Sequence, residues 1–214
     1  MNSKIYNVVI LDKSGSMTSI RKQAVDSVNE TFGCIRSMRK KNAEQEQFVT
    51  LVAFCGCEQK VIYENTPIEK VNDITLADYE PCCMTPLYDA IGNVCTRLHT
   101  TVKDDESASV AVTYENASRE FSGKAIKALI EAYKQEGWMF AYIGADHDVE
   151  SVAFNLSIDN TMTWEKTEEG TEKMAKIVNE SRMKWADNVH YCMAPTPEER
   201  AEMKRRISKN FFNS

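Results

Sequence analysis

The sequence contains no long hydrophobic stretch. The longest apolar run near its start, Val8 to Leu11, is far shorter than the core of a signal peptide, and no segment approaches the length of a membrane span. These absences argue against a membrane partner and predict a protein that stays in the compartment where it is made. We therefore expect a cytoplasmic location.

An excess of positive charge is also absent. The chain carries 26 lysines and arginines against 32 acidic residues, which gives a formal charge of −6. Nucleic-acid binding needs a concentrated basic surface to neutralise phosphates, so nucleic acid is not the expected partner. Basic residues do gather between Arg200 and Lys209, but Glu198, Glu199 and Glu202 share that segment, which predicts a solvated helix of mixed charge.

The seven cysteines follow no regular spacing, and their number is odd. Without an export signal, their thiols are expected to be reduced and to form no disulfide. The pairs Cys55-Gly56-Cys57 and Cys82-Cys83 suggest zinc as an alternative. However, the usual two-residue spacing between zinc ligands is missing and no histidine lies close in sequence. The pattern therefore favours free thiols over a zinc site.

Strand-like and helix-like patterns alternate along the chain. Hydrophobic residues make up 43% and charged residues 27%, as in ordinary globular proteins. The alternation predicts an α/β fold with a doubly wound, mostly parallel central sheet and helices on both faces. We expect one domain over residues 1–214, with a core of about 5–155 and a C-terminal helical extension, 156–214, packed on or near it. Expected strands are 6–11, 48–54, 60–64, 109–113 and 139–143, the second and third antiparallel; expected helices are 18–39, 85–98, 122–135, 148–154 and 168–186.

The loop after the first expected strand carries hard oxygen ligands. Asp12, Ser14 and Ser16 offer one carboxylate and two hydroxyls at the carboxyl end of a parallel strand, where ligand sites of such sheets lie. These groups suit Mg²⁺, Ca²⁺ or Mn²⁺. Because only one of them is charged, a bound cation would keep a position open for an oxygen from another protein.

This spacing, together with a later threonine that leads into a helix, resembles the metal-ion-dependent adhesion site of the von Willebrand factor type A (VWA) family. The segment with the later threonine runs from Thr85 to Ile91. The resemblance extends over about Tyr6 to Asp146 and is closest to stand-alone bacterial or phage-type members. The resemblance implies a Rossmann-like fold and a non-enzymatic module that binds another protein or peptide through an acidic side chain. It also implies a divalent cation, Mg²⁺ or Mn²⁺ or Ca²⁺, held by Asp12, Ser14, Ser16 and Thr85.

The chain departs from the family pattern after its fourth expected strand. Family members commonly continue there with Thr-Asp-Gly, whose aspartate completes the site, but here Thr113 is followed directly by Tyr114 and Glu115. Loss of a carboxylate removes a strong attraction for the cation, so weak binding is expected unless Glu115 or Asp146 substitutes. The alternative is an interaction or scaffold protein of the same fold with a degenerate, metal-free site.

Two enzyme classes and one structural interpretation compete with a metal site. Phosphatases of the haloacid dehalogenase type place an aspartate at the same strand end, but they need a second carboxylate as general acid where this chain has Ser14. Lys13 to Ser16 lacks the glycines and lysine placement of a phosphate-binding loop. Ser16, Thr18 and Thr85 could also act simply as helix N-caps.

Overall fold

The computed structural model describes residues 3–103, 106–113, 120–145, 148–190, 192 and 196–212, without the side chain of Thr113. Its strands form one six-stranded sheet in the order β3-β2-β1-β4-β5-β6. The strands are β1 (Ser3–Asp12), β2 (Gln45–Phe54), β3 (Gln59–Pro67), β4 (Ser107–Thr113), β5 (Met139–Gly144) and β6 (Asn160–Thr163). Only β3 pairs antiparallel, with β2. The predicted α/β class is confirmed, and β1 lies between β2 and β4.

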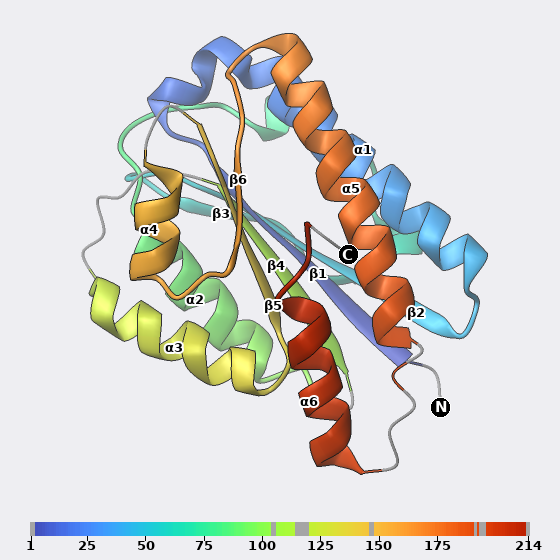
Figure 1. Ribbon diagram of the computed structural model, residues 1–214. Coiled ribbons are helices and arrows are strands. Elements are labelled where there is room, and N and C mark those ends of the chain that lie inside the picture. The colour runs from blue at the N-terminus through green and yellow to red at the C-terminus, as the bar shows by residue number, and fades with distance from the viewer. Residues whose placement is uncertain are drawn as a thin grey trace.

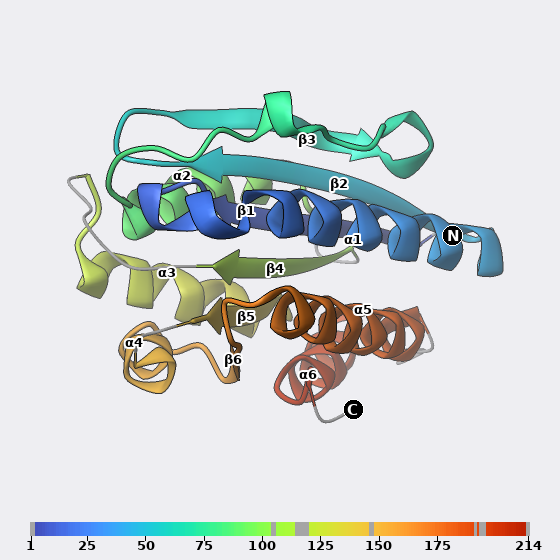
Figure 2. The same cartoon turned by 90° about the horizontal axis from the view of Figure 1, so that it is seen from above.

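Helices cover both faces of this sheet (Figures 1 and 2). Apolar residues of α1 (Arg21–Lys41) and α5 (Glu168–His190) share one core cluster on one face. On the other face α2 (Leu87–His99), α3 (Gly123–Gln135) and the short α4 (Val149–Asn155) enclose a second cluster. The last helix, α6 (Pro197–Ser208), contacts α3, α5 and β5. No helix in the described ranges combines the length and apolarity needed to cross a membrane.

Alternation along β1 explains why both faces are covered. Tyr6, Val8 and Ile10 point into the cluster beneath α2 and α3, whereas Ile5 and Leu11 point toward α1 and α5. Side chains of successive strand residues project to opposite faces, so a continuous apolar run requires a layer of helices on each side. The run from Val8 to Leu11 therefore dictates a buried central strand.

A polar network interrupts the apolar face between α5 and the sheet. Arg182 is 1% exposed, and its Nη1 donates hydrogen bonds to Asn7 Oδ1 (3.2 Å) and Ser109 Oγ (3.1 Å). Asn7 Nδ2 in turn donates to Gln47 Oε1 at 2.9 Å. Burial lowers the pKa of the Arg182 guanidinium, and its Nε has no hydrogen-bond partner among the described residues. The network ties α5 to β1, β2 and β4.

The edge strand β6 was not anticipated from the sequence. It lies within the segment expected to be helical, pairs in parallel with β5 and is anchored by the buried side chain of Asn160. Asn160 Nδ2 donates to the carbonyls of Phe140 (2.9 Å) and Ser208 (2.7 Å), and Asn160 Oδ1 accepts from the N–H of Phe211 (2.9 Å). A short polar strand fixed by amide hydrogen bonds leaves no hydrophobic periodicity to recognise.

The C-terminal basic residues are only partly solvated, contrary to expectation. Lys204 is 4% exposed, and its Nζ donates to the carbonyl of Glu106 at 2.7 Å. Arg205 remains at the surface, where it pairs with Glu202 of the same helix. The charged face of α6 is therefore mixed as predicted, but one of its lysines stabilises the packing of the helix.

Replacing Gly92 with Ala in α2 is expected to lower the free energy of unfolding by about 1–3 kcal/mol. A Cβ at this position would lie 2.6 Å from Cε2 of Phe121, and this overlap outweighs the gain in helix propensity of about 1 kcal/mol. Gly33→Ala in α1 is the matched control, because nothing lies within 4 Å of its added Cβ, and it is expected to stabilise. Urea unfolding of both variants compares them; a Gly92→Ala protein as stable as Gly33→Ala would contradict the packing described.

Candidate functional site

The loop after β1 gathers three of the predicted ligand residues. Asp12 ends the strand and is 1% exposed. Its Oδ1 accepts a hydrogen bond from the backbone N–H of Ser14 at 2.7 Å, and its Oδ2 accepts from Ser14 Oγ at 2.9 Å. The hydroxyls of Ser14 and Ser16 lie 3.1 Å apart. One carboxylate and two hydroxyls thus form a compact set of oxygen donors, with Asp12 and Ser14 buried and Ser16 exposed.

Thr85 lies on a second loop that pairs with the first through its backbone. Cys82 N–H donates to the carbonyl of Lys13 (2.8 Å), and Gly15 N–H donates to the carbonyl of Cys83 (3.1 Å). Thr85 itself is 6% exposed. The expected capping role is wrong by one residue: α2 begins at Leu87 with Pro86 as its N-cap. Thr85 therefore precedes the N-cap residue and does not cap α2.

Tyr79 supports the loop through the backbone of Asp12, and no pattern in the sequence points to it. The side chain is fully buried, and its hydroxyl donates to the backbone carbonyl of Asp12 at 2.5 Å. Burial, reinforced by the Asp12 carboxylate, raises the pKa of the Tyr79 phenol far above its usual value, so the hydroxyl stays a proton donor. Arg21 Nε holds the backbone of Tyr79 by a 2.8 Å hydrogen bond.

The Tyr79→Phe variant is expected to lose about 1–2 kcal/mol of stability, because a buried hydrogen bond to the Asp12 carbonyl disappears without loss of the ring. Tyr63→Phe removes a hydroxyl that donates to the carbonyl of Asn72 (3.0 Å) and accepts from its N–H (3.2 Å), both at an exposed position, and should cost less. Chemical denaturation of both variants measures how much stability each one loses. Equal midpoints for Tyr79→Phe and the parent chain would show that the hydroxyl does not support the loop.

A second acidic side chain in this region has a structural task. Asp89 is 6% exposed, and its Oδ1 accepts hydrogen bonds from the N–H groups of Glu120 and Phe121, both at 2.8 Å. Asp89 thus fixes α2 to the chain that leads into α3. Glu115 and Asp146, the substitutes considered for the missing aspartate, lie outside the described residues.

A disulfide joins the Thr85 loop to the β2–β3 turn. Cys57 and Cys83 are bonded, with their Cα atoms 6.6 Å apart, so the prediction of free thiols throughout is wrong for this pair. The other five cysteines are free. The prediction failed because 26 residues separate the partners, and only the antiparallel turn between β2 and β3 brings Cys57 beside Cys83.

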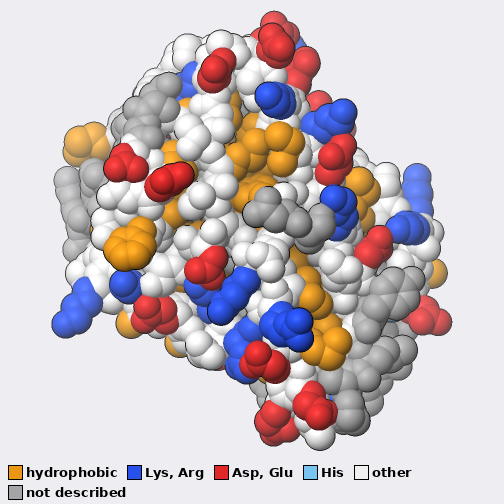
Figure 3. Space-filling view, in the orientation of Figure 1, with side chains coloured by type: hydrophobic (Ala, Val, Ile, Leu, Met, Phe, Trp, Pro, Cys, Tyr) orange, Lys and Arg blue, Asp and Glu red, His pale blue; other side chains and the backbone are white. Residues whose placement is uncertain are grey.

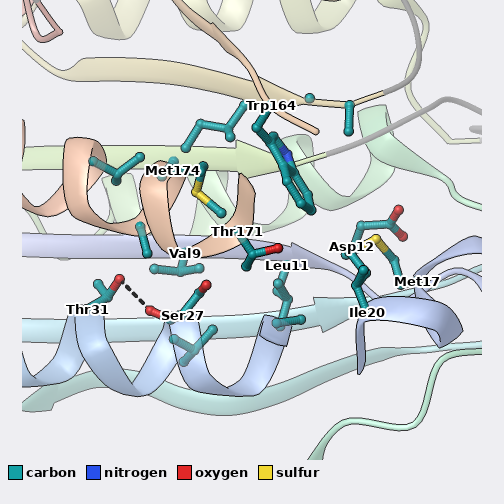
Figure 4. A pocket seen from close by; sticks show the side chains of 18 of the residues that line it. Val9, Leu11, Asp12, Met17, Ile20, Ser27, Thr31, Trp164, Thr171 and Met174 are labelled. Atoms are coloured by element: carbon teal, nitrogen blue, oxygen red, sulfur yellow. Dashed lines mark hydrogen bonds between the residues drawn. The ribbon is translucent and has the colours of Figure 1, made fainter. Parts of the chain in front are cut away.

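An apolar cavity of about 90 Å³ opens beside Asp12 between the sheet and helices α1 and α5 (Figure 4). Met17 and Ile20 approach it from the β1 loop, and Trp164 and Met174 from the opposite side. In Figure 3 apolar side chains are visible at the surface between β6 and α5, with charged groups around them. This apolar wall lowers the local dielectric and strengthens any interaction between the Asp12 carboxylate and a cation.

Neither a protein-family model nor a curated protein sequence matches this chain. Solved structures do match it. The SpRpn10 VWA domain aligns with a TM-score of 0.57 at 11% identity, over 81% of this chain and 94% of that domain. The pilus adhesin SpaC from Lactobacillus rhamnosus GG aligns with a TM-score of 0.61 at 11% identity, over 86% of this chain and 30% of the adhesin.

Proximal thread matrix protein 1 from the mussel byssus, in a structure described as having a zinc-occupied MIDAS motif, aligns with a TM-score of 0.57 at 12% identity. The alignment covers 85% of this chain, which spans 46% of the mussel protein's length. At such low identity these structures establish the fold alone. The chain has a VWA-type α/β fold.

Proposed function

We propose that this chain is a divalent-cation-dependent protein-interaction module. Asp12, Ser14, Ser16 and Thr85 hold one Mg²⁺, or Mn²⁺ or Ca²⁺ in its place, and the cation accepts an acidic side chain from a protein or peptide partner. The observation that carries the proposal is the cluster of Asp12, Ser14 and Ser16 oxygens at the end of β1. The similarity of the fold to the pilus adhesin SpaC, to the SpRpn10 VWA domain and to the mussel protein with its zinc-occupied MIDAS supports it.

The small number of negatively charged ligands determines what the site can bind. Asp12 is the one carboxylate among the four proposed ligands, so a divalent ion bound there keeps a net positive charge. An acidic side chain from a partner would both neutralise this charge and complete the oxygen shell. The apolar wall beside Asp12 would exclude water from the contact.

The same loop argues against an enzyme. Ser14 stands where a phosphatase of this topology would place its general acid, and its hydroxyl already donates to Asp12 Oδ2. A serine hydroxyl cannot deliver a proton to a leaving group near neutral pH as a carboxylic acid would. We therefore propose a binding role without catalysis, in the cytoplasm of a bacterial or phage-infected cell; the location and source stay predictions.

One observation favours a second candidate, an interaction protein with a metal-free site. Both carboxylate oxygens of Asp12 accept hydrogen bonds from Ser14, so the loop is internally satisfied without a cation. The departure from Thr-Asp-Gly after β4 points in the same direction. In this case the surface would bind its partner by direct contacts.

A metal titration followed by thermal unfolding separates the two candidates. A cation that binds only the folded chain must raise its melting temperature as the concentration increases. We expect Mn²⁺ and Mg²⁺ to do so at millimolar concentrations, and Ser14→Ala to reduce the shift. Ser37→Ala, which removes an exposed hydroxyl of α1, is the control. An unchanged melting temperature of the parent chain at all metal concentrations would favour the metal-free candidate.

A further inference from the structure

Four cysteines from two distant segments converge beside the Thr85 loop. Cys55 and Cys57 flank the turn between β2 and β3, and Cys82 and Cys83 precede Thr85. The sulfur atoms of Cys55 and Cys82 are 3.2 Å apart, and those of Cys55, Cys57 and Cys82 all lie within 4.8 Å of one another. The fourth sulfur, of Cys83, is bonded to that of Cys57. The sequence spacing argued against a zinc site, because the two pairs lie far apart along the chain and only the fold brings them together.

The backbone positions both segments independently of the disulfide. Cys55 N–H and Glu58 N–H each donate to the other residue's carbonyl, at 2.9 and 3.3 Å, which closes the turn. Gly56 N–H donates to the carbonyl of Met84, and a Cβ at Gly56 would lie 3.2 Å from that oxygen. The close approach of the two loops is therefore built from main-chain contacts that would persist when the sulfur atoms are reduced.

We propose that, when the disulfide between Cys57 and Cys83 is reduced, Cys55, Cys57, Cys82 and Cys83 form a tetrathiolate site for one Zn²⁺. Tetrahedral zinc binds thiolate sulfur at about 2.3 Å, which places neighbouring sulfur atoms about 3.8 Å apart. The sulfur atoms of Cys55 and Cys82, 3.2 Å apart, and that of Cys57, within 4.8 Å of both, are near this spacing, whereas the Cys83 sulfur, bonded to Cys57, has to turn toward the other three once the disulfide is reduced. Soft thiolates select zinc over the hard cations that suit the oxygen donors of Asp12.

The charge around the cluster fits an anionic metal centre. Zn²⁺ with four thiolates carries a net charge of −2, so a positive charge beside it would favour binding. Lys13 is 4% exposed, lies next to Cys82 through a backbone hydrogen bond (2.8 Å) and shares its charge with Glu58 in a salt bridge. A buried lysine ammonium is thus held next to the sulfur atoms.

Reduction of the Cys57–Cys83 disulfide needs one external reductant, a small dithiol. The dithiol transfers two electrons and two protons to the Cys57–Cys83 bond, which becomes two thiols while the dithiol becomes a cyclic disulfide. Zn²⁺ then displaces four thiol protons as the four sulfur atoms coordinate it. Cys57 and Cys83 are exposed and Cys55 is buried, so a reductant reaches the bonded pair first. Either state, disulfide or zinc, fastens the loop that carries Thr85.

Cobalt titration of the reduced, metal-free protein under anaerobic conditions tests the proposal. We expect about one Co²⁺ per chain with the absorption of thiolate-to-metal charge transfer and of tetrahedral cobalt, and displacement of this spectrum by Zn²⁺. Cys82→Ser and Cys83→Ser should each weaken binding by at least about tenfold. Cys34→Ser, which changes a cysteine of α1, should leave the spectrum unchanged.

Asp12→Ala distinguishes this site from the proposed adhesion site, because it removes an oxygen ligand and should leave the thiolate spectrum intact. The proposal fails if a folded protein with seven titratable thiols shows no thiolate–cobalt absorption, or if Cys82→Ser and Cys83→Ser retain it. It also fails if Cys57 and Cys83 are reduced only after the chain unfolds.

Discussion

Replacing Asp12 with Ala is expected to abolish Mn²⁺ and Mg²⁺ binding at the end of β1 while the chain stays folded. Asp12 supplies the one carboxylate among the proposed ligands, and the hydroxyls of Ser14 and Ser16 cannot repay the dehydration of a divalent ion. We expect the affinity measured by calorimetry to fall by about a hundredfold or more, which corresponds to about 2.7 kcal/mol. Metal-dependent capture of a partner should disappear with it.

A matched variant controls for the loss of a charge. Asp26→Ala removes a carboxylate from the exposed face of α1, where it pairs with Lys22, and should leave metal binding unchanged. Circular dichroism of Asp12→Ala should match that of the parent chain. Tight binding that survives Asp12→Ala would mean that another carboxylate anchors the ion, with Glu115 and Asp146, the substitutes expected from the sequence, as the candidates.

The Asn7→Leu variant is expected to be the most destabilised of the fold variants, by about 3–5 kcal/mol. Asn7 Oδ1 accepts from the buried Arg182, and its amide also donates to Gln47. Removal of the amide leaves a desolvated guanidinium with Ser109 Oγ as its remaining hydrogen-bond partner among the described contacts. Urea denaturation measures the loss.

A double variant separates lost hydrogen bonding from a change in packing. Asn7→Leu combined with Arg182→Met replaces the hydrogen-bonded amide and guanidinium with apolar side chains, and replacing both buried polar partners is often neutral or stabilising. We expect the double variant to recover most of the stability that Asn7→Leu loses. If Asn7→Leu alone stays within about 0.5 kcal/mol of the parent chain, the network does not hold α5 on the sheet.

The sequence predicted the sheet because its strands carry strong local signals. The apolar run in β1 forces burial on both faces, and the segments that became β2, β4 and β5 share this character. The edge strand β6 lacks such a signal, since its position depends on hydrogen bonds between Asn160 and three residues distant in sequence. Strand periodicity reports burial, and β6 is fixed by polar contacts instead.

In the candidate site, too, some residues could be predicted from the sequence and others could not. Asp12, Ser14 and Ser16 could be found because they lie within five residues, and in the structure their oxygens lie close together. Tyr79 and Asp89 were missed. Tyr79 donates to a backbone carbonyl and Asp89 accepts from backbone N–H groups, and neither contact can be predicted from sequence spacing. The two cysteine pairs were noticed in the sequence, but their spacing argued against a zinc site, because the two halves of the cluster meet only in the folded chain.

A crystal structure of the protein grown with Mn²⁺ tests the central claim most directly. We expect an anomalous peak beside Asp12, with oxygen atoms of Asp12, Ser14 and Ser16 among its neighbours. Soaking with Mg²⁺ should give the same site, with metal–oxygen distances of about 2.1 Å. The absence of a peak at millimolar metal, or a peak whose ligands do not include Asp12, would contradict the proposed adhesion site.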